Sequence, residues 1–300
     1  MQPYRVALPF LLMTLLASGC GPGGDQDGGQ DQAGPDSLAT GGPADRQVVK
    51  VGGKLFGIPS PAQTMLLLKR SGKTYQKDGA LPLDLAEKLT TRTTRGLALG
   101  AYGADLAYAT AFQDGQKALS TLIAVEKIGQ DLGLASAFDR TLVEKFKTNL
   151  MHEDSLLRLS GTAYRAADEY LKSDQQEDLS ALVLAGGWVE SMYLSLAGLD
   201  KGIPEALKDR IGQQQRTIQG LIGLLSAHSA AEGVPALLDA FRKLDALYQG
   251  IQVTYQFEQP VTEPAKRTTY INGTSSANVT DEHLRSIADQ ISALRAQIKA

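Results

Sequence analysis

The sequence predicts a mainly α protein, built as a multi-helix bundle or as stacked helical hairpins, with a small β-hairpin near the C-terminus. Three observations support this fold class. Apolar residues recur at helical spacing through most of residues 61–253. Gly- and Pro-containing breaks divide that stretch into segments of helix length. Short β-like runs rich in β-branched residues stand at residues 48–51 and within 251–279.

Residues 1–19 have the pattern of a secretion signal, with Arg5, an apolar run too short to span a bilayer, and small residues directly before Cys20. This ending resembles a bacterial lipobox, in which the cysteine is lipidated and becomes the first residue of the mature protein. Leucine is usual three positions before the cysteine, where this chain has Ala17, and an ordinary secreted protein is the alternative. We expect lipidation of Cys20 and attachment to the membrane through that N-terminal lipid.

Residues 20–46 are rich in Gly, Asp and Gln and hold no aromatic side chain, which predicts a disordered tether. Gly21 rather than Asp follows the cysteine, and by resemblance to the enterobacterial sorting signal this favours the outer membrane. The expected location is therefore the cell envelope, lipid-anchored at the outer membrane. The periplasmic and surface faces both remain open.

Composition argues against several classes of function. Removal of residues 1–19, which hold one Arg and no acidic residue, leaves 29 basic and 33 acidic residues, so nucleic-acid binding gains no support. The three histidines lie far apart in the sequence and have no ligand at a metal spacing, so no metal site is expected. Phosphate-loop, dinucleotide and serine-elbow motifs are absent, and no cofactor is expected.

Residues 47–300 form the expected folded domain. Ser60 before Pro61 predicts the start of a helix that ends near Ser71-Gly72. After Pro82, helical periodicity predicts helices at 84–112, 115–132, 139–150, 154–172, 175–198, 204–227 and 234–253.

The C-terminal part predicts β-structure followed by a helix. Residues 251–255 and 268–271 are β-branched, and Asn272-Gly273 suits a tight turn. We expect this hairpin to pair with residues 48–51. Thr280 then caps an amphipathic helix. Its apolar side chains are Leu284, Ile287, Ile291, Leu294 and Ile298.

Two apolar segments, 99–108 and 184–193, align without gaps at an offset of 85 residues. The alignment indicates either duplicated helical hairpins or a chance match in an Ala- and Leu-rich chain. Both segments are apolar on nearly every face, which predicts central helices. Glycine inside a helix costs about 1 kcal/mol relative to alanine, so their glycines indicate close helix approach. These glycines are Gly100, Gly103, Gly186 and Gly187.

Asp105 and Glu190 are the carboxylates that we expect to be buried in these helices. A buried ionised acid must be paired, or its pKa rises. One interpretation is structural, with each acid accepting hydrogen bonds from a tyrosine or an arginine. The other is an acidic and aromatic pocket for a cationic or sugar-like ligand. Its candidate ligand-binding residues are Tyr102, Asp105, Tyr108, Trp188, Glu190 and Tyr193.

Three motifs carry a resemblance: Phe56 through Pro61, Gly100 through Ala109, and Leu184 through Ser191. On these motifs the chain resembles an uncharacterised helical lipoprotein family of Bacteroidota, over most of residues 55–298. The resemblance implies an envelope location and a helical fold. It supplies no activity and no catalytic residue.

The sequence therefore predicts a lipid-anchored helical module of the cell envelope with a non-enzymatic protein-binding or scaffold role. The expected partner is another envelope protein. Two alternatives remain: a small-ligand-binding lipoprotein that uses the acidic and aromatic pocket, and a hydrolase that acts on an envelope polymer.

Overall fold

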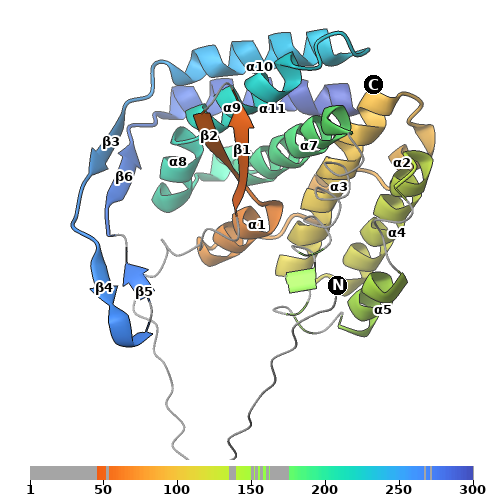
Figure 1. Ribbon diagram of the computed structural model, residues 1–300, viewed down its shortest axis with the longest axis horizontal. Helices are drawn as coiled ribbons and strands as arrows, with labels where there is room; N and C mark the ends of the chain where they lie inside the picture. The colour runs from red at the N-terminus through yellow and green to blue at the C-terminus, as the bar shows by residue number, and fades with distance from the viewer. Residues whose placement is uncertain are drawn as a thin grey trace, which may run out of the picture. The chain divides into compact units, whose positions relative to one another are not determined.

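The computed structural model is mainly α, as predicted (Figure 1). The predicted signal peptide, Cys20, the tether up to residue 45 and most of the helix expected at 154–172 lie outside the residues that the structure describes. The described residues are 46–51, 54–134, 140–149, 152, 155, 158–159, 162, 176–266, 268–270 and 272–299.

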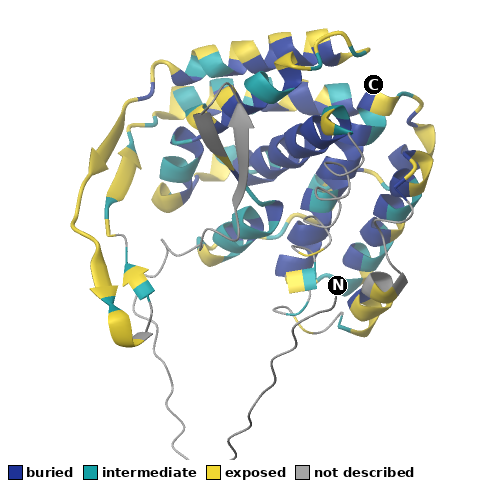
Figure 2. Ribbon diagram, in the orientation of Figure 1, coloured by how far each residue is buried: buried dark blue, intermediate teal, exposed yellow. Residues whose placement is uncertain are grey.

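Helices α3 (Arg92–Ala111) and α7 (Glu177–Leu196) form the centre of the fold, and nearly all of their residues are buried (Figure 2). α7 also packs against α1 (Pro61–Arg70), α9 (Gln215–Ser226) and α11 (Asp281–Ile298). By length and composition alone, α7 could cross a membrane, but 78% of its most apolar window is buried inside the protein. That burial is typical of a core helix.

Glycines allow α3 and α7 to touch backbone to backbone. A Cβ atom at Gly100 would lie 1.9 Å from the carbonyl oxygen of Val183, and one at Gly186 would lie 1.9 Å from that of Leu97. The predicted close approach is therefore confirmed at these two glycines. The two contacts are related by an offset of 86 residues, so the crossing is locally two-fold symmetric.

The two helices run in the same direction. Gly96 lies against Leu179 and Leu182, and Gly100, one turn later, lies against Gly187. Parallel neighbouring helices need a long connection. Here the connection includes α4 (Gly115–Asp131), which packs on α3, and α5 (Arg140–Thr148), which packs on α4.

Two predicted helices are each divided by a turn. The segment expected at 84–112 is α2 (Leu85–Lys88) followed by α3, because Leu89 is extended and the side chain of Thr91 caps the second helix. The segment expected at 204–227 is α8 (Glu205–Gly212) followed by α9. α10 (Val234–Tyr248) ends earlier than the predicted 234–253 and packs on α9 and α11.

Predicted caps are confirmed at two helices. Ser60 Oγ accepts a hydrogen bond from the backbone N–H of Gln63 at the start of α1. Thr280 and His283 form a reciprocal capping box at the start of α11. The five apolar side chains predicted to line α11 are all buried.

The β-structure differs from the prediction. β1 (Arg46–Val51) pairs with β2 (Lys54–Pro59), so the expected pairing of residues 48–51 with the C-terminal hairpin is wrong. β2 pairs with β1 in place of the C-terminal strands because only two residues connect β1 and β2, so closing this short loop costs little conformational entropy. β1 and β2 form a sheet of their own.

The C-terminal strands form an antiparallel arm, called the β-arm below and defined as residues 253–277. β3 (Val253–Gln256) pairs with β6 (Thr274–Ala277), and β4 (Val261–Glu263) pairs with β5 (Thr268–Tyr270). A short 3₁₀ helix, η5 (Pro264–Lys266), follows β4. The predicted tight turn at Asn272-Gly273 is wrong, because these residues join β5 to β6 along one side of the arm. Gly273 instead lies against the hydroxyl end of the Tyr255 side chain.

Candidate functional site

A buried ion pair joins Glu190 of α7 to Arg295 of α11. The Nε and Nη2 atoms of Arg295 donate to Oε2 and Oε1 of Glu190, each at 2.7 Å. Nη2 also donates to the carbonyl oxygen of Gly79 at 2.8 Å. The Glu190 side chain is fully buried and that of Arg295 is 7% exposed. The bidentate geometry and the added carbonyl offset the cost of removing both charges from water.

Asp105 of α3 belongs to the same cluster. It is 1% exposed, and its Oδ2 atom accepts a hydrogen bond from the backbone N–H of Leu81 at 2.9 Å. Burial raises the pKa of Asp105 well above its usual range, and the negative charge of Glu190 raises it further. Burial raises the pKa of Glu190 as well, but the hydrogen bonds and charge of Arg295 oppose that rise. Asp105 is therefore the neutral acid of the pair and Glu190 the ionised one.

A proton on Asp105 would account for its carboxyl oxygen Oδ1, which has no hydrogen-bond partner among the described residues. A neutral carboxyl group has an O–H to donate, and the Glu190 carboxylate, whose charge raises the pKa of Asp105, is the acceptor that this O–H would need. Arg295 donates two hydrogen bonds to the same carboxylate.

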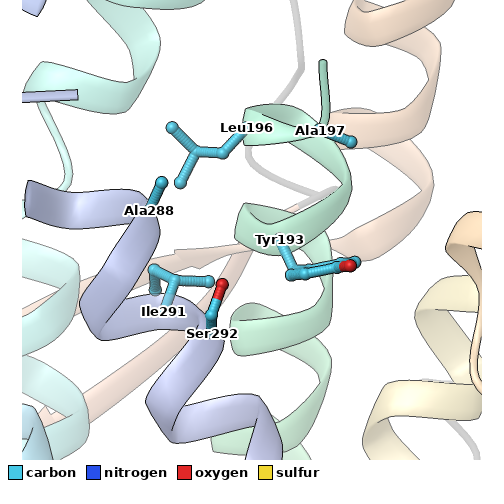
Figure 3. A pocket seen from close by; sticks show the side chains of 6 residues that line it. All are labelled: Tyr193, Leu196, Ala197, Ala288, Ile291 and Ser292. Atoms are coloured by element: carbon cyan, nitrogen blue, oxygen red, sulfur yellow. The ribbon is translucent and has the colours of Figure 1, made fainter. Parts of the chain in front are cut away.

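Tyr193 completes the cluster on its outer side. The Cζ atom of Arg295 lies 3.8 Å from the centroid of the Tyr193 ring, which is a cation–π contact. Beside Tyr193, a pocket of about 80 Å³ opens between α7 and α11 (Figure 3). Ligand pockets typically measure about 300–1,000 Å³, so this one is small. Its lining residues are Tyr193, Leu196, Ala197, Ala288, Ile291 and Ser292.

A second pocket, of about 150 Å³, lies apart from the acidic cluster. It is lined by Lys77, Gln116, Lys117 and Ser120. It too is smaller than a typical ligand pocket.

Two tyrosines of α3 hold the loop that precedes α2. The Tyr108 hydroxyl accepts a hydrogen bond from the backbone N–H of Gln76 at 2.8 Å, and the Tyr102 hydroxyl donates to the carbonyl oxygen of Pro82 at 2.6 Å. Burial raises the pKa of both hydroxyl groups. With Asp105 and Arg295, these side chains satisfy four backbone groups between residues 76 and 82.

Trp188 lies on another face of α7. Residues two apart on a helix are about 200° apart, so Trp188 and Glu190 point to nearly opposite sides. The Trp188 indole donates to Gln214 Oε1 at 3.1 Å, and its ring lies 6.0 Å from that of Phe241. The structure thus brings Asp105, Glu190 and Tyr193 together but separates Trp188 from them, and ligand binding by the six predicted residues stays a prediction.

Sequence reasoning did not identify Arg295, although a signal was present. Arg295 stands four residues after Ile291 and three before Ile298, so helical spacing places it on the apolar face of α11. A charged residue on a buried stripe implies a buried partner. Glu190 was already expected to need one.

The exposed apolar side chains of the β-arm are the second feature that sequence reasoning did not identify, although it predicted β-structure there. Among the described residues, large hydrophobic side chains that remain exposed gather within nine positions of the arm: Val253 at 50%, Tyr255 at 58%, Phe257 at 68% and Val261 at 52%. Elsewhere in the described part, Ile123 of α4 is the one comparable case, at 58%.

No family model, curated protein or solved structure matches the chain. In the part of the chain that the structure describes, no group of three or more His, Cys, Asp or Glu side chains is placed to hold a metal ion. Arguments about function therefore come from the buried cluster, the two small pockets and the exposed arm.

Proposed function

We propose that this protein is a lipid-anchored module of the cell envelope with a non-enzymatic, protein-binding role, and that the β-arm is its contact surface. The observation that carries the proposal is the gathering of exposed apolar side chains on that arm. Single exposed hydrophobic residues are normal on protein surfaces, whereas a contiguous group marks an interaction site. Tyr and Phe are also enriched at the centres of protein interfaces.

The arm is built for contact rather than for supporting the core. All four residues of β3 are exposed, and so are most residues of β4 and β6 (Figure 2). The side chains of Val253 and Tyr255 lie opposite Ala277 and Ser275, which are too small to cover them. A two-stranded ribbon is marginal on its own in water. Burial of its apolar side chains against a partner would stabilise it.

The state of the acidic cluster favours binding through the arm over binding in the core. Glu190 accepts two hydrogen bonds from Arg295, and the tyrosine hydroxyls of α3 are bonded to backbone groups. A ligand at these residues would have to displace bonds within the protein. The arm requires no such exchange, because its apolar side chains already face solvent.

Crosslinking in native membranes tests the proposal. The full-length protein would be crosslinked mildly, purified by affinity and analysed by mass spectrometry, together with a Tyr255→Ser/Phe257→Ser variant. Ile123→Ser is the matched control, because Ile123 is as exposed as Tyr255 but lies on α4. We expect a stoichiometric protein partner, a second copy included, that is lost with the arm variant and kept with the control. Equal recovery from all three proteins would overturn the proposal.

A further inference from the structure

We propose that the occupant of the β-arm is a second copy of this chain, paired antiparallel along the outer edge of β3. This inference rests on the proposed function and specifies the partner. The two arms would form one four-stranded sheet in the order β6, β3, β3, β6.

The outer edge of β3 follows from hydrogen-bond alternation in its pairing with β6. In an antiparallel pair, backbone groups of alternate residues point toward the partner strand and away from it. Gln252 accepts a hydrogen bond through its carbonyl oxygen from the N–H of Asn278 at 2.9 Å, so even-numbered residues of this strand face β6. The backbone groups of Val253 and Tyr255 therefore point outward.

The opposite edge of the ribbon is already occupied. On β6, the Ala277 N–H donates to Asp209 Oδ1 at 2.9 Å, and the Ser275 carbonyl accepts from Gln213 Nε2 at 2.8 Å. Both partners come from the end of α8 and the residue that follows it. β6 thus lies between α8 and β3, and β3 is the outermost strand (Figure 1). One edge is covered by side chains, and among the described residues no strand pairs with the other edge.

The open edge is complementary to itself. When two copies of the strand pair about a two-fold axis at Tyr255, Val253 lies opposite Phe257 of the other copy. Phe257 directly follows β3, and with the strand continued by that one residue all of these side chains fall on one face, because side chains alternate along a strand. Their cross-strand contacts would stabilise the pairing.

Charge and polarity agree with the same register. Thr254 would lie opposite Gln256 on the polar face. Glu258 would lie opposite Gln252 rather than opposite its own copy, so no like charges meet. Because the other edge is covered by α8, pairing adds one copy and stops, which gives a closed dimer rather than a filament. Attachment of both copies to one membrane would raise their effective concentration.

Paired cysteines test the register without altering the apolar face. Full-length Thr254→Cys and Gln256→Cys chains, carrying different tags, would be produced together and oxidised gently in native membranes. These positions face each other in a non-hydrogen-bonded pair, whose Cα atoms lie about 4.5 Å apart, within disulfide range. We expect a mixed disulfide dimer. Far less should form from Thr254→Cys alone, where the two cysteines are offset by two residues.

Controls separate this inference from the proposed function. The parent chain shows any contribution of Cys20, and Ser275→Cys on the covered side of β6 should give no dimer. Adding Phe257→Ser to the cysteine pair should reduce dimer yield by about tenfold or more, because the apolar ring would no longer be buried between the two arms. Absence of the mixed dimer would overturn the inference. If an unrelated partner were nevertheless lost with the Tyr255→Ser/Phe257→Ser variant, the proposed function would stand without it.

Discussion

At the scale of single residues, one proton decides how the buried cluster is held together. Asp105 and Glu190 are both removed from water, and two adjacent carboxylates would repel each other. Arg295 settles which acid is ionised because it donates to both oxygens of Glu190. A neutral Asp105 then accepts the hydrogen bond of the Leu81 N–H without adding a second buried negative charge beside Glu190.

Replacement of Asp105 by Asn should make stability less sensitive to pH. The amide can accept from Leu81 N–H and donate to Glu190, so at about pH 4 the change in unfolding free energy should be within about 1 kcal/mol. The folded pKa of Asp105 is raised above the unfolded value of about 3.9, so its contribution is present at low pH and is lost as pH rises. Between those two pKa values, the wild type should lose about 1.4 kcal/mol per pH unit relative to Asp105→Asn.

Urea unfolding of both proteins at a series of pH values from 4 to 8 measures this difference. Asp105→Leu is the matched comparison, because it removes both hydrogen bonds and should destabilise the protein at every pH. A constant difference between the wild type and Asp105→Asn across the series would mean that Asp105 is ionised in the folded protein.

At the scale of elements, the crossing of α3 and α7 depends on glycine more than on side-chain packing. Gly100 and Gly186 each face a backbone carbonyl of the other helix, and backbone has no rotamer with which to move away. The cost in helix propensity, about 1 kcal/mol per glycine, is offset by contact along two nearly fully buried helices.

Gly100→Ala and Gly186→Ala should therefore destabilise the protein despite the gain in helix propensity. An added Cβ would lie 1.9 Å from a carbonyl oxygen, so the helices must separate. Overpacking of this kind costs roughly 1–3 kcal/mol or more. Gly250→Ala is the control, because its Cβ would make an ordinary 3.5 Å contact with His283. Thermal unfolding followed by circular dichroism compares the three, and an unchanged Tm for both helix variants would contradict the assigned crossing.

How far the sequence predicts the helices and the site depends on whether the signal is local. The caps at Ser60 and Thr280 are predictable because the side chain and the backbone it bonds are a few residues apart. Burial of Glu190 follows from the apolar segment around it, whereas its pairing with Arg295 joins positions 105 residues apart. Periodicity identifies a buried stripe on each helix but does not show which stripes face each other.

At the scale of the whole described domain, the helical body and the β-arm have different compositions and different burial. The body buries its apolar residues in one large cluster that involves nearly every helix and in a smaller cluster between α3, α4 and α5. The arm leaves Val253, Tyr255, Phe257 and Val261 exposed. Its β-branched pattern was visible in the sequence, but the choice of partner strand was not, because β-pairing depends on which edges are near in space. β1 pairs with β2, and among the described residues no strand pairs with the outer edge of β3 in the arm.

Removal of the arm should leave the body folded and abolish association. Residues 254–276 would be replaced by a short Gly- and Asn-containing link, which is sterically simple because the Asn278 N–H already bonds the Gln252 carbonyl across the base of the arm. The excised residues are mostly exposed, and Ser275 is joined to the body by the bond from Gln213, so the unfolding free energy should change by no more than about 1–2 kcal/mol. Urea unfolding would measure this change, and co-purification of two differently tagged copies from membranes would measure association.

Collapse of the helical circular dichroism signal would show that the arm is part of the core. Retained co-purification of a correctly folded deletion variant would place the contact surface on the helices instead.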